Sequence, residues 1–117
     1  MSDFNPVSVE QSIRQCANNI ARGVTVCSNA YAEFLKADHV YDQAFAKAYL
    51  DAGGAAHERK YIAELATAEE REKRDIADAA YRYADRQAKA LESELRAMQS
   101  VGASVRGMYG VAGRGEQ

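Results

Sequence analysis

The sequence predicts an all-α protein that folds as a long antiparallel helical hairpin of coiled-coil type. Three observations predict it: an apolar stripe with heptad spacing in the first half, a Gly-Gly pair near the middle, and a helical pattern that resumes afterwards. The 117 residues suffice for one domain. Alanine supplies much of the 47% hydrophobic content and buries little area. We therefore expect thin helices packed along their length instead of a deep core.

The first helix is predicted over about residues 8–52. Pro6 disfavours an earlier helix, and Ser8 with Gln11 has the spacing of a capping box. Steps of four and three then alternate along one stripe, which is typical of a helix that packs on a partner helix. Its members are Ile13, Ala17, Ile20, Val24, Cys27, Tyr31, Phe34, Asp38, Tyr41, Phe45, Ala48 and Ala52. Asp38 alone among them is polar.

A turn is predicted at Gly53-Gly54, because either glycine can adopt the left-handed conformation that ends helices. The second helix is expected over about residues 56–106. Its stripe has an extra step of four near Ala84 and runs through Ile76, Ala80, Ala84, Ala88, Leu91, Leu95 and Met98. Thr67 and Glu70 have the spacing of a second capping box. A helix broken near Thr67 and a continuous helix both fit this pattern.

Glycines crowd the C-terminal segment, at positions 102, 107, 110, 113 and 115. The second helix should therefore fade between Ser100 and Arg106, leaving residues 107–117 as a flexible, Gly-rich tail. The tail is either a solvated terminus or a peptide that a partner orders, and Tyr109 and Arg114 are its candidate contacts.

Bulk composition excludes several classes of protein. The formal net charge of −2 gives no indication of a strongly charged partner. No apolar run approaches the roughly 20 residues of a membrane span. The N-terminus lacks the pattern of a signal peptide, so we expect a cytoplasmic location.

The two cysteines are expected to be free. Cys16 and Cys27 would lie about 16 Å apart on one helix, too far for a bond within the chain. Buried thiols are the favoured interpretation, and a cross-link between protomers is the alternative. His39 and His57 lack metal-ligand spacing, and no phosphate-binding loop or Glu-x-x-His motif occurs. We therefore expect no catalytic residues, no metal, no cofactor and no enzymatic activity.

Charges on the second helix form acid–base pairs four residues apart, with the acid first, which stabilises helices. These pairs are Glu69–Lys73, Glu70–Arg74, Asp78–Arg82, Asp85–Lys89 and Glu92–Arg96. The alternative is a basic ridge that binds the phosphates of a nucleic acid, formed by Arg82, Arg86, Lys89 and Arg96. Helix stabilisation is favoured, because most of these cations have an acidic neighbour one turn away.

Several motifs resemble a group of small bacteriophage proteins of helical-hairpin form. They are Ala48-Tyr49-Leu50 before the glycines, Glu58-Arg59-Lys60, residues 63–67, Met98-Gln99-Ser100 and Ser104-Val105-Arg106. The resemblance covers roughly residues 30–116. Such proteins are often encoded near phage recombination and replication genes, which implies an accessory role in those processes. The resemblance implies no catalytic residues.

Together these observations predict a non-enzymatic interaction protein that forms a dimer or a larger oligomer and docks on a phage or host protein. A hairpin of two helices buries one stripe of each, so a partner is expected to supply further burial. The candidate partner-binding residues are Arg59, Gln99, Ser104, Arg106, Tyr109 and Arg114. A nucleic-acid-binding accessory and a structural component of a virion are the two alternatives.

Overall fold

The computed structural model describes the backbone of residues 5–115 and the side chains of residues 5–110. The described residues form the helices α1 (Pro6–Asp51), α2 (Ala56–Ala66) and α3 (Ala68–Gly115). This confirms the predicted all-α class. None of the described helices is apolar enough over a sufficient length to cross a membrane.

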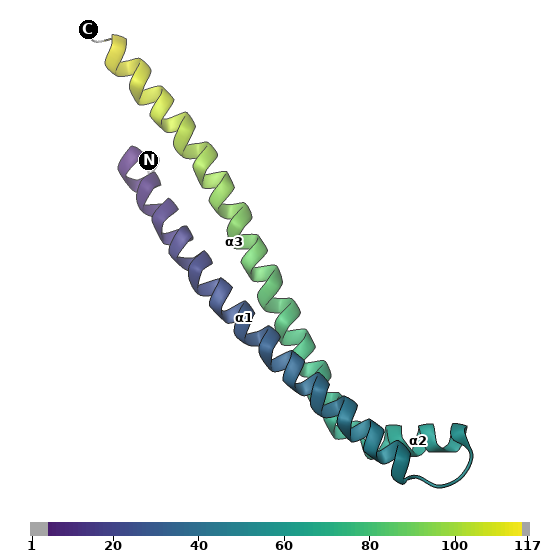
Figure 1. The fold of residues 1–117 in the computed structure, drawn as a ribbon. Helices are drawn as coiled ribbons and strands as arrows, with labels where there is room; N and C mark the ends of the chain where they lie inside the picture. The colour runs from purple at the N-terminus through teal and green to yellow at the C-terminus, as the bar shows by residue number, and fades with distance from the viewer. Residues whose placement is uncertain (1–4, 116–117) are drawn as a thin grey trace. The chain divides into compact units, whose positions relative to one another are not determined.

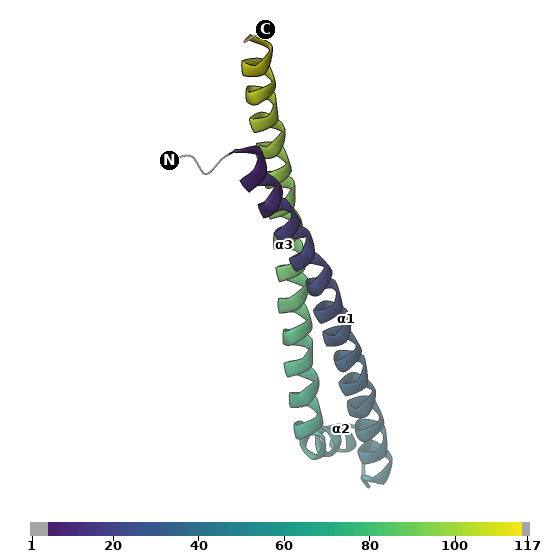
Figure 2. The ribbon, with the colours of Figure 1, turned by 90° about the vertical axis from the view of Figure 1, so that its left-hand side faces the viewer.

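The chain divides into two compact units. The first comprises residues 1–25 and 86–117, and the second comprises residues 26–85. Within the first unit, α1 and α3 lie side by side in opposite directions (Figures 1 and 2). Gly102 lies against Val9 there, while Leu91 lies against Gly23.

The second unit contains the end of α1, all of α2 and the beginning of α3. Its two long helices are also antiparallel, because the Tyr31 ring contacts that of Tyr81 and Arg74 lies over Tyr41. The centroids of the two tyrosine rings are 4.9 Å apart. The antiparallel arrangement that the sequence predicts is thus confirmed.

The buried stripe of α1 differs from the predicted one at alternate positions. Its buried or half-buried members are Val9, Ile13, Cys16, Ile20, Gly23, Cys27, Ala30, Phe34, Ala37, Tyr41, Ala44 and Ala48. Six of these were predicted, and the predicted Asp38, Phe45 and Ala52 are half-buried as well. The predicted Ala17, Val24 and Tyr31 are exposed, and the residue before each is less exposed. The preceding residues are small, and small residues allow two helix backbones to approach closely. The structure therefore favours the close approach of the two helix backbones over the burial of the larger side chains.

The buried stripe of α3 keeps the heptad spacing without a break. It runs through Glu70, Arg74, Ala77, Tyr81, Ala84, Ala88, Leu91, Leu95, Met98, Gly102 and Val105. The predicted extra step near Ala84 is therefore wrong. Ile76 is 62% exposed, and Ala80 is also exposed. Ala77 and Tyr81 occupy the stripe instead, since the Tyr81 ring packs against α1.

The N-terminus of α1 is capped three residues earlier than predicted. The backbone N–H of Ser8 donates to Asn5 Oδ1 at 2.9 Å, and the Ser8 hydroxyl donates to the Asn5 carbonyl at 3.2 Å. Asn5 is therefore the cap, and Ser8 belongs to the first turn. The physical reason is that Pro6 suits the first helical position and asparagine is a strong capping residue.

The turn between α1 and α2 uses Gly54, which has a φ of 98°. A Cβ at Gly54 would lie 2.9 Å from Glu58 Oε2, whereas one at Gly53 would meet nothing within 4 Å. The chain then enters α2, which lies crosswise between the end of α1 and the beginning of α3 (Figures 1 and 2).

Thr67 separates α2 from α3, so the structure selects the broken helix from the two possibilities. The Thr67 hydroxyl donates to the Ala63 carbonyl at 2.7 Å, and its backbone N–H donates to the same oxygen at 3.1 Å. The predicted capping box with Glu70 is wrong, because this hydroxyl is directed back to α2. Glu70 Oε2 is buried and makes no hydrogen bond with the residues that the structure describes.

The C-terminal segment is helical, which corrects the prediction of a flexible tail. Helix α3 continues past Arg106 as far as Gly115. Glycine costs only about 1 kcal/mol in a helix, and no proline interrupts the backbone hydrogen bonds of this segment. The last two residues of the predicted tail, 116–117, lie outside the described residues.

Candidate partner-binding site

Two surface grooves lie in the first unit, where the beginning of α1 packs on residues 94–106 of α3. Val9 and Val105 are buried there, and Gly102 allows the helices to approach closely. A Cβ at Gly102 would lie 3.2 Å from Val9 Cγ1, which is tighter than an ordinary contact. This close packing gives the surrounding side chains a rigid support.

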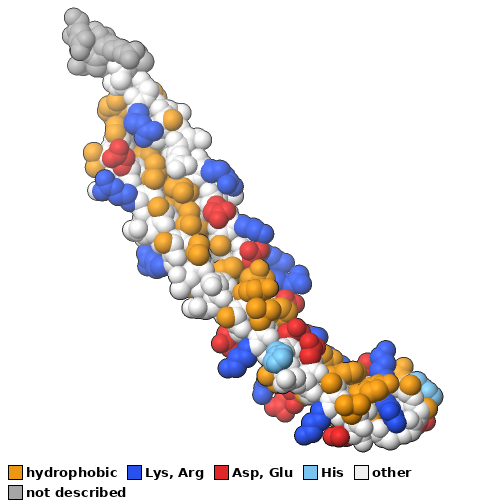
Figure 3. Space-filling model, viewed as in Figure 1, with side chains coloured by type: hydrophobic (Ala, Val, Ile, Leu, Met, Phe, Trp, Pro, Cys, Tyr) orange, Lys and Arg blue, Asp and Glu red, His pale blue; other side chains and the backbone are white. Residues whose placement is uncertain are grey.

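An apolar groove of about 380 Å³ flanks this packed seam. Its lining consists of Ser8, Val9, Ser12, Glu94, Ala97, Met98 and Val101. Hydrophobic side chains remain visible on the surface of this unit in the space-filling view (Figure 3). The groove suits an apolar side chain from a partner, with the Glu94 carboxylate at its polar part.

A second, more polar groove of about 380 Å³ is also formed by α1 and α3. Its lining consists of Glu10, Ile13, Arg14, Gln99 and Arg106. Two guanidinium groups outnumber the single carboxylate here. Because guanidinium groups bind carboxylates through two hydrogen bonds, this groove suits an acidic side chain.

The structure brings together part of the predicted partner-binding set. Gln99 and Arg106 line the same groove, whereas Ser104 is exposed elsewhere on α3. Tyr109 is 53% exposed, one turn beyond Val105. Arg114 lies within α3, but its side chain lies outside the described residues.

Arg59 does not join this set. It belongs to the second unit, where its Nε donates to the Gly54 carbonyl at 3.0 Å. That hydrogen bond closes the turn before α2, so Arg59 has a structural use that the sequence motif did not indicate.

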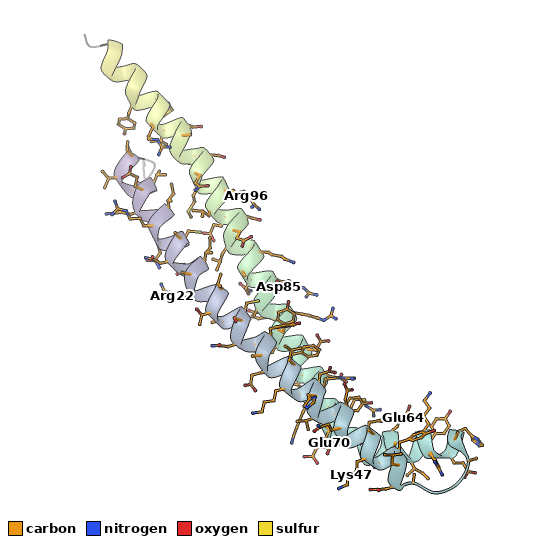
Figure 4. All side chains as sticks on the ribbon, viewed as in Figure 1. Arg22, Lys47, Glu64, Glu70, Asp85 and Arg96 are labelled. Atoms are coloured by element: carbon orange, nitrogen blue, oxygen red, sulfur yellow. The ribbon has the colours of Figure 1, made fainter. Side chains whose placement is uncertain are left out.

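The basic ridge proposed from spacing is only partly engaged in ion pairs. Arg82 Nε contacts Asp78 at 3.0 Å, as predicted. The predicted Glu69–Lys73 pair, which lies outside the ridge, also forms, with its charged atoms 3.5 Å apart. Arg96 instead donates to Ser93 Oγ at 3.3 Å and projects away from α1 (Figure 4). The predicted Glu92–Arg96 pair is therefore not the contact that the structure shows.

Two other members of the ridge lie in the first unit with Arg96. Arg86 is exposed and forms no ion pair with the residues that the structure describes. Lys89 is exposed as well. The spacing of Arg86, Lys89 and Arg96 places all three on the side of α3 that faces away from α1.

The Glu70–Arg74 pair is also replaced. Arg74 Nη2 contacts Asp75 Oδ1 at 3.0 Å, and its guanidinium lies over the Tyr41 ring. Arg74 and Glu70 both belong to the buried stripe, but the Arg74 guanidinium contacts the Tyr41 ring and the Asp75 carboxylate instead of the Glu70 carboxylate.

Cys16 is buried, and its thiol donates to the Leu91 carbonyl at 3.4 Å. Burial raises the pKa of this thiol, and the nearby Glu94 carboxylate raises the pKa further. Both cysteines are free thiols, and Cys27 is half-buried. Within the described part of the chain, no group of three or more histidine, cysteine and acidic side chains could hold a metal ion.

Three residues of the polar groove were missed from the sequence, namely Glu10, Ile13 and Arg14. A usable signal exists, since Glu10 and Arg14 are the next residues after Val9 and Ile13 in the buried stripe. Residues beside a heptad stripe border the partner helix. Which segment of α3 lies opposite Glu10 and Arg14 depends on the packing register of the two helices, which the sequence pattern does not give.

No family model, curated protein or solved structure matches this chain.

Proposed function

We propose that this chain is a non-enzymatic helical interaction protein that forms oligomers and docks on a protein partner. The resemblance to phage helical-hairpin proteins supports a phage or host partner and an accessory role in phage DNA recombination or replication. One observation carries the docking proposal: α3 continues for three turns beyond the residues that pack on the beginning of α1.

This extension repeats the spacing of the buried stripe. Steps of three and four lead from Gly102 through Val105 to Tyr109, yet Tyr109 is 53% exposed and Met108 is 65% exposed. Glycines at 107, 110, 113 and 115 weaken the segment as an isolated helix by about 1 kcal/mol each. A second helix packed on Tyr109 would offset that cost by burying apolar surface.

The charges beside the stripe define the partner's chemistry. Arg106 and Arg14 lie in the polar groove next to this extension, where Glu10 is the one acidic side chain of the lining. The proposed partner element is therefore an amphipathic helix with an acidic flank. Its apolar residues contact Tyr109, and its carboxylates contact Arg106.

Affinity capture with the full chain from phage-infected cells tests this proposal. Wild type should retain a protein whose cross-links to residues 99–109 map to an acidic amphipathic helix. Arg106→Glu combined with Tyr109→Ala should lower its recovery at least tenfold. Arg86→Glu, an exposed charge reversal elsewhere on α3, should leave recovery unchanged. Equal recovery with all three proteins would overturn the proposal.

The outward-facing Arg86 and Arg96 favour a second candidate function, which is the binding of single-stranded nucleic acid. A mobility-shift assay at two salt concentrations tests it, since phosphate contacts weaken steeply with salt. Arg86→Glu with Arg96→Glu should abolish salt-sensitive binding if this function holds. Absence of binding by wild type at low salt would rule it out.

A further inference from the structure

One side of the second unit carries exposed apolar side chains from both long helices beside a groove of about 360 Å³. Val40 of α1 lines this groove together with Ala37 and Ala77, and Val40 is 48% exposed. Val26 precedes Val40 by two heptads, which places both on the same side of α1. Val26 is more than half exposed.

Helix α3 adds two larger apolar side chains to this side of the unit. Lys73 lines the groove, and Ile76 follows it by one turn of α3. Tyr83 follows Ile76 by one heptad, and both residues are more than half exposed. We call Val26, Val40, Ile76 and Tyr83, together with the groove, the groove face.

The groove also contains an acid and a base on α1 that make no ion pair. Glu33 and Lys36 both line it, and both are exposed. No salt bridge joins either of them to another residue that the structure describes. Of the other charged lining residues, Lys73 contacts Glu69 at 3.5 Å, and Glu70 is half-buried. Glu33 and Lys36 are therefore available to a second chain.

We propose that the groove face is the self-association surface and that its occupant is the groove face of a second copy, packed antiparallel. The second units of the two copies form a four-helix bundle about a two-fold axis that crosses α1 between Glu33 and Lys36. Because the axis reverses the helix direction, Glu33 of each copy lies opposite Lys36 of the other. The acid–base order on α1 is thus complementary to itself, which selects a second copy as the occupant.

The same axis brings the apolar residues of the groove face together. Val40 of one copy lies within about one helical turn of Val26 of the other. The ring contact of Tyr31 with Tyr81 sets the level of α3 beside α1. The axis therefore passes between Ile76 and Ala80, and these two residues meet across it. This inference rests on the oligomerisation in the proposed function and names its surface.

Sedimentation equilibrium and light scattering on the full chain test this surface. Wild type should form a dimer of twice the 12.8 kDa chain mass. Val40→Glu should raise the dimer dissociation constant at least tenfold while preserving the helical circular dichroism. The matched control is Leu35→Glu, because Leu35 is 47% exposed and lies about 140° around α1 from Val40. It should leave the dissociation constant unchanged.

A charge exchange separates this antiparallel pair from general stickiness. Glu33→Lys alone should weaken the dimer, and adding Lys36→Glu to the same chain should restore it, because opposite charges again face each other. A dimer that resists Val40→Glu, or is not restored by the exchange, overturns the groove face but leaves oligomerisation and docking intact. A monomeric wild type overturns the groove face and oligomerisation together, whereas partner capture is measured independently.

Discussion

The guanidinium of Arg74 lies over the ring of Tyr41, 4.4 Å from its centroid. This contact joins α3 to α1 within the second unit, and it places a charged residue in the buried stripe. A cation over an aromatic face is attracted by the ring's electrons, and its long side chain covers apolar surface.

A double-mutant cycle measures this contact. Arg74→Met and Tyr41→Leu should each lower the free energy of unfolding, and the double variant should lose about 0.5–1 kcal/mol less than the sum of the two. Urea denaturation followed by circular dichroism provides the values. Asp75→Ala is the control, because its exposed pair with Arg74 should contribute less. Strict additivity of Arg74→Met and Tyr41→Leu would show that the contact is not stabilising.

The turn before α2 offers a matched pair of glycine substitutions. Gly54→Ala should destabilise the protein by about 1 kcal/mol or more, because Gly54 has a positive φ and an added Cβ would meet Glu58. Gly53→Ala should be tolerated, since nothing lies within 4 Å of its Cβ position. Thermal unfolding of the two variants checks the difference. Equal melting temperatures would contradict the assignment of the turn conformation to Gly54.

A second glycine pair tests the close approach of the helices in the first unit. Gly23→Ala should stabilise the protein by up to about 1 kcal/mol, because the helix gains propensity and the new Cβ makes an ordinary 3.6 Å contact with Leu91. Gly102→Ala has the same gain in propensity but crowds Val9 and Ile13. It should therefore be less stable than Gly23→Ala by about 1 kcal/mol. The reverse order in urea denaturation would contradict the packing at Gly102.

The two cysteines should differ in reactivity. At pH 8, iodoacetamide should modify Cys27 faster than Cys16, because Cys16 is buried and its raised pKa lowers its thiolate fraction. Mass spectrometry of the native protein, with the unfolded protein as reference, gives both rates. Faster modification of Cys16 in the native protein would contradict its burial.

The same shift predicts a pH dependence of stability. A pKa that is higher in the folded state means that the folded protein holds the Cys16 proton more tightly. The resulting stabilisation is full below the pKa of the unfolded thiol and is lost as the pH rises through the higher folded pKa. Between these two pKa values, the unfolding free energy should fall more steeply with pH for wild type than for Cys16→Ala. Parallel curves would contradict the prediction.

The residues of the partner-binding site could be predicted only in part from the sequence. Gln99 and Arg106 could be selected from α3 because they lie near its end, but Arg14 could not be matched to them. The reason is that the match depends on which residue of α1 faces Gly102, and close approach at Gly102 sets that register. Arg59 was selected by its motif, yet its guanidinium bonds the Gly54 carbonyl.

The sequence by itself determined the helical class, the two long helices, the turn at Gly53-Gly54 and half of the α1 stripe, because heptad spacing and glycine chemistry are local properties. Only the tertiary structure decided that Gly23 replaces Val24 in the stripe and that Ala77 replaces Ile76. When one helix is considered alone, side-chain size and hydrophobicity favour the larger apolar residue at such positions. The packing of two helices favours the small one, since its gain comes from the approach of a second backbone that no single-helix pattern contains.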